Sequence, residues 1–152
     1  MPGSVSATGK DTLQINGRNL ADFADADYIS IEFPEDMSSM KVSKNGNILE
    51  ASNENGRRCG LTARLLAGSD DDKFLNSLFQ MQKNDYAAFV DMTGVYAKRI
   101  GKGDGNVNSV VYSLAGGRFK KQLPAKTNAE GDVEQSAVVY VFQFVCDVRT
   151  IQ

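Results

Sequence analysis

The chain has 152 residues, of which 41% are hydrophobic, with a formal net charge of -2 and no histidine. Its length and apolar content suit one domain, residues 1–152, with a buried core, and the lack of a basic excess argues against a general nucleic-acid binder. Without histidine the chain lacks the commonest general base and any Ser-His triad, so the composition disfavours an enzyme, and no motif predicts a cofactor.

The N-terminal segment, residues 1–11, is small and polar, and we expect it to form a flexible arm. It has no apolar stretch of the secretory-signal type, and no run of about 20 apolar residues elsewhere predicts membrane insertion. Residues 12–15 predict a short strand that ends at the turn signal Asn16-Gly17.

The next segments predict paired strands. Residues 28–33 alternate apolar and polar side chains, as in a half-buried strand. Residues 40–44 and 47–52 predict two more strands, joined by Asn45-Gly46, which suits a type I′ turn with two positive φ angles. The side chains expected to face inward from the first of these strands are Met40 and Val42.

A second turn signal of the same kind, Asn55-Gly56, precedes a predicted strand over residues 57–66. Its apolar residues alternate and predict one core-facing row, namely Cys59, Leu61, Ala63 and Leu65. Residues 40–66 therefore predict an antiparallel meander with a polar face.

Residues 68–82 predict the one convincing helix of the chain. Ser69 is a favourable N-cap, and the aspartates that follow suit the positive end of the helix dipole. They are successive residues that point in different directions, so they do not predict a metal site. The apolar stripe consists of Phe74, Leu75, Leu78 and Phe79, and it has to pack on a sheet.

The second half of the chain returns to strands. Residues 86–93 predict a strand, residues 98–109 an exposed glycine-rich loop, and residues 110–123 a strand interrupted by a bulge at 115–117. Residues 134–151 predict a long central strand, because its middle is apolar on both faces. The fold class is mainly β with one flanking α-helix, an antiparallel β-sandwich or open barrel.

Two cysteines, Cys59 and Cys146, lie far apart in apolar surroundings. Buried free thiols are the favoured interpretation, while a bridge between subunits stays open. Polar residues on the strands of the first half predict one hydrophilic sheet face: Tyr28, Ser30, Glu32, Lys41, Ser43, Asn45, Glu50, Ser52, Arg58, Thr62 and Arg64. This face is either an ordinary solvated surface or the lining of a water-filled channel in an assembly.

Three motifs occur in a characteristic order: EFPED at 32–36, KNGN at 44–47 and SDDDKFLNSL at 69–78. Together with the terminal AVVYVFQF they make residues 20–151 resemble tail tube proteins of contractile-tailed bacteriophages. The resemblance implies a β-sandwich with a flanking helix and no catalytic activity. Six copies would form a ring, rings would stack into a hollow tube, and hairpins would join into one inter-subunit β-barrel around the lumen.

The resemblance also implies partners and a location. The tube would lie inside a sheath in the virion tail, after assembly in the host cytoplasm, and would contact tape measure, terminator and baseplate or tail-tip proteins. DNA would pass through it without specific binding. Alternatives are a tail terminator, a secreted type VI-like tube protein, or a monomeric β-sandwich binding module.

Three groups of candidate residues follow from this resemblance and from the solvent exposure that the sequence predicts for polar segments. The lumen-facing candidates are Glu32, Glu50, Ser30, Ser43 and Ser52. The candidates for contacts between rings are Lys98, Arg99, Lys102, Asp104, Lys10 and Asp11. The helix residues expected to face a neighbour or the sheath are Asp70, Asp71, Asp72 and Lys73.

Overall fold

The computed structural model describes residues 6–7, 11–24, 28–101, 103–125 and 136–151. In this part the chain forms one α-helix, α1 (Asp70–Asn84), and the 3-10 turn η1 (Glu54–Arg57). The strands are β1 (Ser6–Ala7), β2 (Thr12–Ile15), β3 (Arg18–Leu20), β4 (Ile29–Glu32), β5 (Ser38–Val42), β6 (Ile48–Ser52), β7 (Arg58–Leu66), β8 (Met92–Gly101), β9 (Val107–Phe119) and β10 (Ala137–Ile151).

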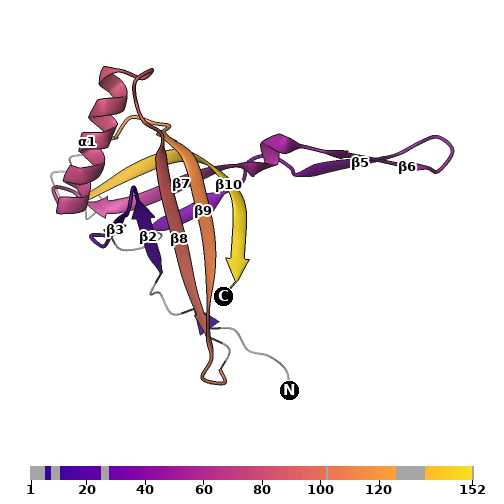
Figure 1. Cartoon of the computed structure of the whole chain (residues 1–152), viewed down its shortest axis with the longest axis horizontal. Coiled ribbons are helices and arrows are strands. Elements are labelled where there is room, and N and C mark those ends of the chain that lie inside the picture. Colours follow the sequence, from indigo (N-terminus) through magenta and orange to yellow (C-terminus); the bar gives the residue numbers. More distant parts are fainter. Residues whose placement is uncertain (1–5, 8–10, 25–27, 102, 126–135, 152) are drawn as a thin grey trace.

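The main sheet is antiparallel and follows the order β3-β2-β8-β9-β10-β7-β4, with β1 also paired to β8 (Figure 1). Within the described residues it stays open between β3 and β4 and does not close into a barrel. The predicted class, mainly antiparallel β with one flanking helix, is confirmed. So is the central place of the last strand, because β10 pairs with β7 on one side and β9 on the other.

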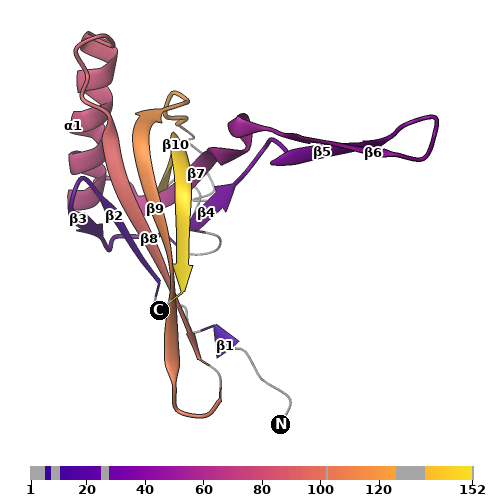
Figure 2. The same ribbon diagram turned by 45° about the vertical axis from the view of Figure 1, so that its right-hand side comes forward.

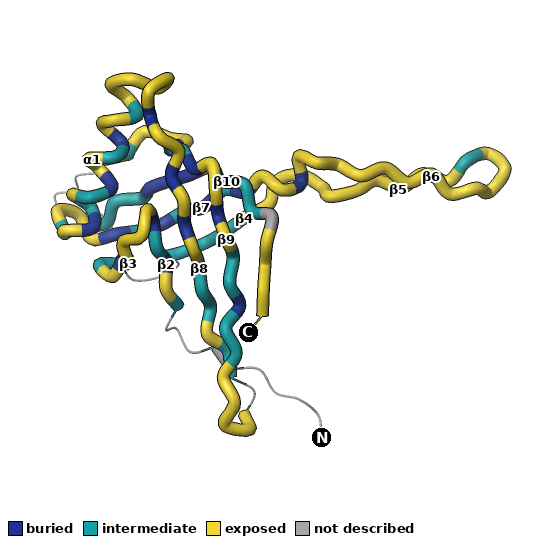
Figure 3. The backbone as a smooth tube through the Cα atoms, in the orientation of Figure 1, coloured by how far each residue is buried: buried dark blue, intermediate teal, exposed yellow. Residues whose placement is uncertain are grey.

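The core lies between the inner face of this curled sheet and α1. Along β7 the predicted row of four alternating apolar residues is buried, as are Tyr140, Phe142 and Phe144 on the neighbouring β10. From α1, Leu75 and Phe79 enter the same cluster. The tube view in Figure 3 shows these buried segments gathered near α1 and the crossing of the long strands.

The helix begins as predicted. The Ser69 hydroxyl accepts a hydrogen bond from the Asp72 amide at 3.2 Å, which satisfies one of the free N–H groups of the first turn. The apolar stripe faces the sheet, with Phe74 and Leu78 packed at the margin of the core. No helix in the described residues is long and apolar enough to cross a membrane.

The predicted strand at 86–93 is wrong in its first part, since residues 86–91 are irregular and β8 begins at Met92. Arg118 explains the difference. Its guanidinium donates to the carbonyls of Tyr86 at 2.7 Å and Phe89 at 3.1 Å, and to Asp91 Oδ1 at 2.7 Å. The side chain of Arg118 therefore satisfies backbone groups that a sheet partner would otherwise have to bind.

The predicted glycine-rich loop at 98–109 is also largely wrong. Arg99 pairs with Ser109 and Gly101 with Val107, so β8 and β9 continue through most of it. Ladder pairing with a long neighbouring strand outweighs the weak strand propensity of this polar segment. The bulge at 115–117 is confirmed, because one residue of β8, Thr93, lies opposite two of β9, Ala115 and Gly116, and the φ of Gly116 is 63°.

The hairpin turns differ in type from the prediction. At the predicted type I′ turn, Ser43 O accepts from Gly46 N at 3.0 Å and Ser43 N donates to Asn47 O at 2.6 Å, and only Gly46 has positive φ (84°). Two successive positive φ angles occur instead at Asn16 (50°) and Gly17 (82°), between β2 and β3. The hairpin itself was correctly predicted.

Of the predicted N-terminal arm, residues 6–7 form β1. Residue 11 is described in contact with β8, and the other residues of that arm lie outside the described part of the chain.

Candidate assembly surface

The hairpin of β5 and β6, residues 38–52, leaves the body of the subunit and forms a separate two-stranded sheet (Figures 1 and 2). We refer to it as the projecting hairpin. Every residue of its two strands is exposed. The prediction that Met40 and Val42 face inward is wrong within the subunit, because these side chains are 62% and 70% exposed. Isolated two-stranded hairpins are marginally stable in water, so contact with another surface would stabilise this hairpin.

The strand register divides the projecting hairpin into two faces. Met40 is opposite Glu50 and Val42 is opposite Ile48, and residues paired in this way point to the same side. The first face, which we call the Met40 face, contains Ser38, Met40, Val42, Ile48, Glu50 and Ser52. The opposite face, the Lys41 face, contains Ser39, Lys41, Leu49 and Ala51.

This register corrects the prediction of one hydrophilic face. Glu50 and Ser52 share a side with the apolar Met40 and Val42, not with Lys41. The error has a simple cause. The turn around Gly46 is one residue longer than a two-residue turn, so it shifts the register of β6 against β5 by one residue. A shift of one residue reverses the side of the hairpin on which each side chain of β6 lies.

The remaining lumen candidates lie apart from Glu50 and Ser52. Ser30 is half-buried on β4 opposite Thr62, and Glu32 is exposed opposite Gly60. Ser43 is at the tip of the projecting hairpin, where its hydroxyl accepts from the Asn47 amide at 3.1 Å. The five residues therefore occupy β4 and the projecting hairpin and do not form one cluster.

The base of the projecting hairpin is held by backbone contacts. The Asn53 amide donates to the Met37 carbonyl at 2.7 Å, and the Asn53 side chain caps η1 by accepting from the Asn55 amide at 3.1 Å. Gly56 is buried in η1 so closely that a Cβ there would lie 2.8 Å from Met37 Cα. The predicted Asn55-Gly56 type I′ turn is therefore wrong, since Gly56 is needed for close packing and not for positive φ.

A groove of about 500 Å³ lies beside this base. Its lining comes from η1, β9, β10 and the segment between β4 and β5: Phe33, Met37, Gly56, Arg57, Tyr112, Cys146, Val148 and Arg149. Arg149 Nε donates to the Tyr112 hydroxyl at 3.0 Å, and the guanidinium lies over the Tyr112 ring, 5.5 Å from its centre. The sequence analysis missed this groove, because its apolar residues come from segments far apart in the chain.

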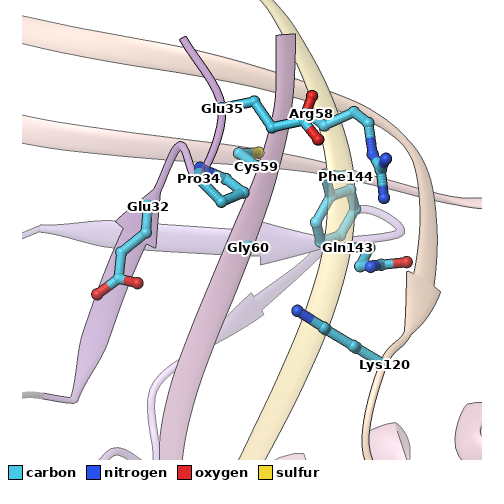
Figure 4. Close-up of a pocket in the computed structure, with 9 residues that line it drawn as sticks. All are labelled: Glu32, Pro34, Glu35, Arg58, Cys59, Gly60, Lys120, Gln143 and Phe144. Atoms are coloured by element: carbon cyan, nitrogen blue, oxygen red, sulfur yellow. The ribbon is translucent and has the colours of Figure 1, made fainter. Parts of the chain in front are cut away.

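A smaller pocket of about 150 Å³ is lined by residues of β4, β7 and β10 and of their connections (Figure 4). In this view Glu32 and Lys120 lie on opposite sides of Gly60, with Arg58 and Glu35 above them. Pockets for drug-sized ligands generally enclose about 300–1,000 Å³, so this one is too small for such a ligand. In the described residues no cluster of acidic residues and cysteines has the arrangement of a metal site.

Neither cysteine forms a disulfide within the subunit. Burial, together with the nearby Cys146, raises the pKa of Cys59 to about 11, so this thiol stays protonated at neutral pH. Cys146 is less buried and lines the groove.

The start of α1 contains one residue that is not on the surface. Asp71 is only 2% exposed, and its carboxylate accepts from the Ala21 amide at 2.6 Å, the Asp22 amide at 2.9 Å and Arg18 Nε at 2.9 Å. Burial by itself would raise the pKa of Asp71, but these hydrogen bonds and the Arg18 charge outweigh burial and hold it below the usual value. The expectation that Asp71 faces a neighbour or the sheath is thereby corrected.

The other helix candidates differ in position. Asp72 is half-buried, and its carboxylate accepts from the Tyr140 hydroxyl at 2.5 Å and from the Gly68 amide at 2.8 Å. It therefore joins α1 to β10. Asp70 and Lys73 are exposed and remain available for contacts outside the subunit.

The candidates for contacts between rings that the structure describes lie on or beside the β8–β9 hairpin. Asp11 accepts from the Arg99 amide at 3.1 Å and from the Tyr96 hydroxyl at 3.3 Å, so it binds its own β8. Asp104 accepts from the Asn106 amide at 3.0 Å in the connecting turn. Lys98 is half-buried and Arg99 exposed, while Lys10 and Lys102 lie outside the described residues.

The fold and the sequence both have relatives among known proteins. A family model described as bacteriophage PhiTE tail tube protein matches residues 2–147. Among solved structures, a chain of the sheath-tube complex of an extracellular contractile injection system, PVC, in its extended state is similar with a TM-score of 0.53. The alignment has 9% sequence identity and covers 93% of this chain and 87% of that one, so it shows a shared fold. None of the curated protein sequences matches. The chain therefore belongs to the bacteriophage PhiTE tail tube protein family and is a structural component of the virion.

Proposed function

We propose that six copies of this tail tube protein form a ring, that the rings stack into a hollow tube inside a contractile sheath, and that DNA leaves through the tube. The observation that carries the proposal is the projecting hairpin, which leaves the subunit with both faces exposed. Such a hairpin is stabilised when it packs on another copy. In a ring, the hairpins of successive subunits would then complete one β-barrel around the lumen.

The open main sheet supports the same proposal. β3 and β4 are its two edges in the described part of the chain, and unpaired edges are sites where another strand can add. Contacts between different surfaces of identical subunits form closed rings or continue as filaments, and a tube uses both. The candidates for contacts between rings, on the β8–β9 hairpin and the N-terminal segment, keep that role as proposals.

The passage of DNA is favoured by the charge of the chain. A bore rich in lysine and arginine would bind phosphates and retard the genome, whereas the net charge of -2 gives no such excess. We retain Ser30, Glu32 and Ser43 as lumen candidates. Glu50 and Ser52 lie on the Met40 face of the hairpin, so they would face the lumen only if that face does not contact a neighbouring subunit.

The tube also has to contact other tail proteins. We propose that Asp70 and Lys73, exposed at the start of α1, face the sheath or a neighbouring subunit. Tape measure, terminator and baseplate or tail-tip proteins would bind the lumen and the two ends of the tube. A tube of a related injection machine is the second candidate function, because the similar solved chain comes from an extracellular injection system.

Electron microscopy of the purified protein tests the proposal, with a preformed tail end as seed where tubes do not start spontaneously. The matched variant replaces residues 39–51 with Asn-Gly, which can join Ser38 to Ser52 because these two residues are paired. We expect hollow tubes of uniform width from the natural chain, and from the variant monomers that keep a β-rich circular dichroism spectrum and unfold cooperatively. Discrete rings that never stack would indicate a terminator, and monomers that fail to extend a seed would refute the tube.

A further inference from the structure

We infer that the groove at the base of the projecting hairpin receives the Met40 face of the projecting hairpin of a second copy of this chain. This inference rests on the proposed tube function and assigns the two surfaces that would meet. The groove supplies Phe33, Met37, Cys146 and Val148, with Arg57 and Arg149 at its rim.

Apolar exposure is the first argument. Met40, Val42 and Ile48 make a continuous apolar row on one side of the hairpin, each at least 60% exposed. The groove likewise leaves Phe33, Met37 and Val148 exposed, and Met37 is 76% exposed. Exposed apolar surfaces of this kind indicate interaction sites. Each copy of the chain has both the apolar row and the groove, so two copies can bring the row of one against the groove of the other.

Charge decides which face of the hairpin enters the groove. The Met40 face has one charged residue, Glu50, whereas the opposite face has Lys41. Arg57 and Arg149 line the groove, where Glu54 holds Arg57 through an ion pair at 3.2 Å and Tyr112 holds Arg149. Glu50 would approach these cations favourably, and Lys41 would be repelled by them.

The occupant has to come from another copy. The projecting hairpin extends away from the body of the subunit, as both views of the ribbon show (Figures 1 and 2), and the groove is lined by residues at its base. Folding it back onto its own groove would break the Asn53–Met37 hydrogen bond and the close packing of Gly56 on Met37. A contact between a hairpin and the groove of the next copy joins two different surfaces, so it can repeat from subunit to subunit.

Native Cys146 provides the test, since it lies in the groove while Cys59 is buried. Met40→Cys, Val42→Cys and Ile48→Cys each place a thiol on the Met40 face, and Leu49→Cys is the matched control on the opposite face. Assembled tubes are treated with a mild oxidant, which joins thiols that already lie in contact into a disulfide, and the linked peptides are identified by mass spectrometry under non-reducing conditions. Each variant is repeated with Cys146→Ser, which removes the groove thiol.

We expect a dimer band joining Cys146 to at least one thiol of the Met40 face, its loss with Cys146→Ser, and no such band with Leu49→Cys. Single-maleimide labelling of Cys146 in the natural chain should be lost on assembly. Glu50→Lys should raise the critical concentration for assembly at least about tenfold, while Lys41→Glu should not.

The outcomes separate the two proposals. Tubes in which Cys146 stays reactive, or in which only Leu49→Cys cross-links to it, would show that the groove assignment is wrong while the tube function stands. A chain that remains monomeric with and without a seed would overturn both.

Discussion

Replacing Gly56 with alanine should redirect the projecting hairpin while leaving the core intact. The added Cβ would lie 2.8 Å from Met37 Cα, 3.0 Å from Asp36 O and 3.1 Å from Met37 N. All three are backbone atoms, so no side-chain rotation relieves the overlap. Carbon atoms in contact prefer about 3.5–4.0 Å, so η1 and the hairpin base have to separate by about 0.7 Å or more.

The consequence should be larger for assembly than for folding. A five-residue strand extends about 17 Å from its base, so a small tilt at Met37 is amplified at the hairpin tip. Overpacking of this kind costs about 1–3 kcal/mol where the whole core has to adjust, and here the strain can be released by the uncovered hairpin. We therefore expect a near-natural melting temperature and a clearly higher critical concentration for tube formation.

Sedimentation at a series of protein concentrations measures the critical concentration, and circular dichroism measures the melting temperature. Gly60→Ala is the control, because its Cβ would meet only the Phe142 carbonyl, at 3.9 Å. If Gly56→Ala assembles at the same concentration as the natural chain and as Gly60→Ala, the direction of the hairpin does not control assembly, and the reasoning fails.

Three further predictions concern the stability of the subunit. Gly117→Ala places a Cβ 2.6 Å from Phe144 Cδ1 in the core, and should cost about 1–3 kcal/mol in urea unfolding, with partial recovery in combination with Phe144→Leu. Asp71→Asn should cost about 1.5–3 kcal/mol, because it removes the charge that accepts three hydrogen bonds, whereas exposed Asp70→Asn should cost far less. The pKa of Asp71 is lower in the folded chain than its ordinary 3.8, so the ionised carboxylate contributes fully to the free energy of unfolding above about pH 4. This contribution is lost as the pH falls through the folded pKa. In the Asp71→Asn variant, the free energy of unfolding in urea should therefore depend less on pH in that acidic range. Arg118→Met should speed hydrogen exchange and proteolysis in residues 86–91 without unfolding the sheet, and unchanged protection there would contradict the role assigned to Arg118.

Local signals in the chain were sufficient for several elements. Ser69 with the aspartates after it and the apolar stripe predicted α1 closely, because capping and helical periodicity act within one or two turns. The alternation from Cys59 to Leu65 predicted the buried face of β7, and the apolar middle of the last segment predicted its central position. The motif order also led to the tail tube family of contractile systems, which the family match confirms.

Other features depended on contacts between distant segments. Asp71 looked like one of three surface aspartates, and its burial follows only from the placement of Arg18 and residues 21–22 beside the helix. The irregular segment before β8 depends on Arg118, about 30 residues later. Neither interaction leaves a periodic trace in the sequence, so pattern analysis had no means to detect it.

The sequence by itself determined the class of the fold, the helix, most strand positions and the family, because propensity, capping and periodicity are properties of neighbouring residues. Only the tertiary structure decided that residues 38–52 leave the body, which of their side chains share the Met40 face, and where the groove lies. The physical reason is that register and direction depend on the turn around Gly46 and on the packing of Gly56 against Met37. Both are set by contacts in space and not by the order of apolar and polar residues.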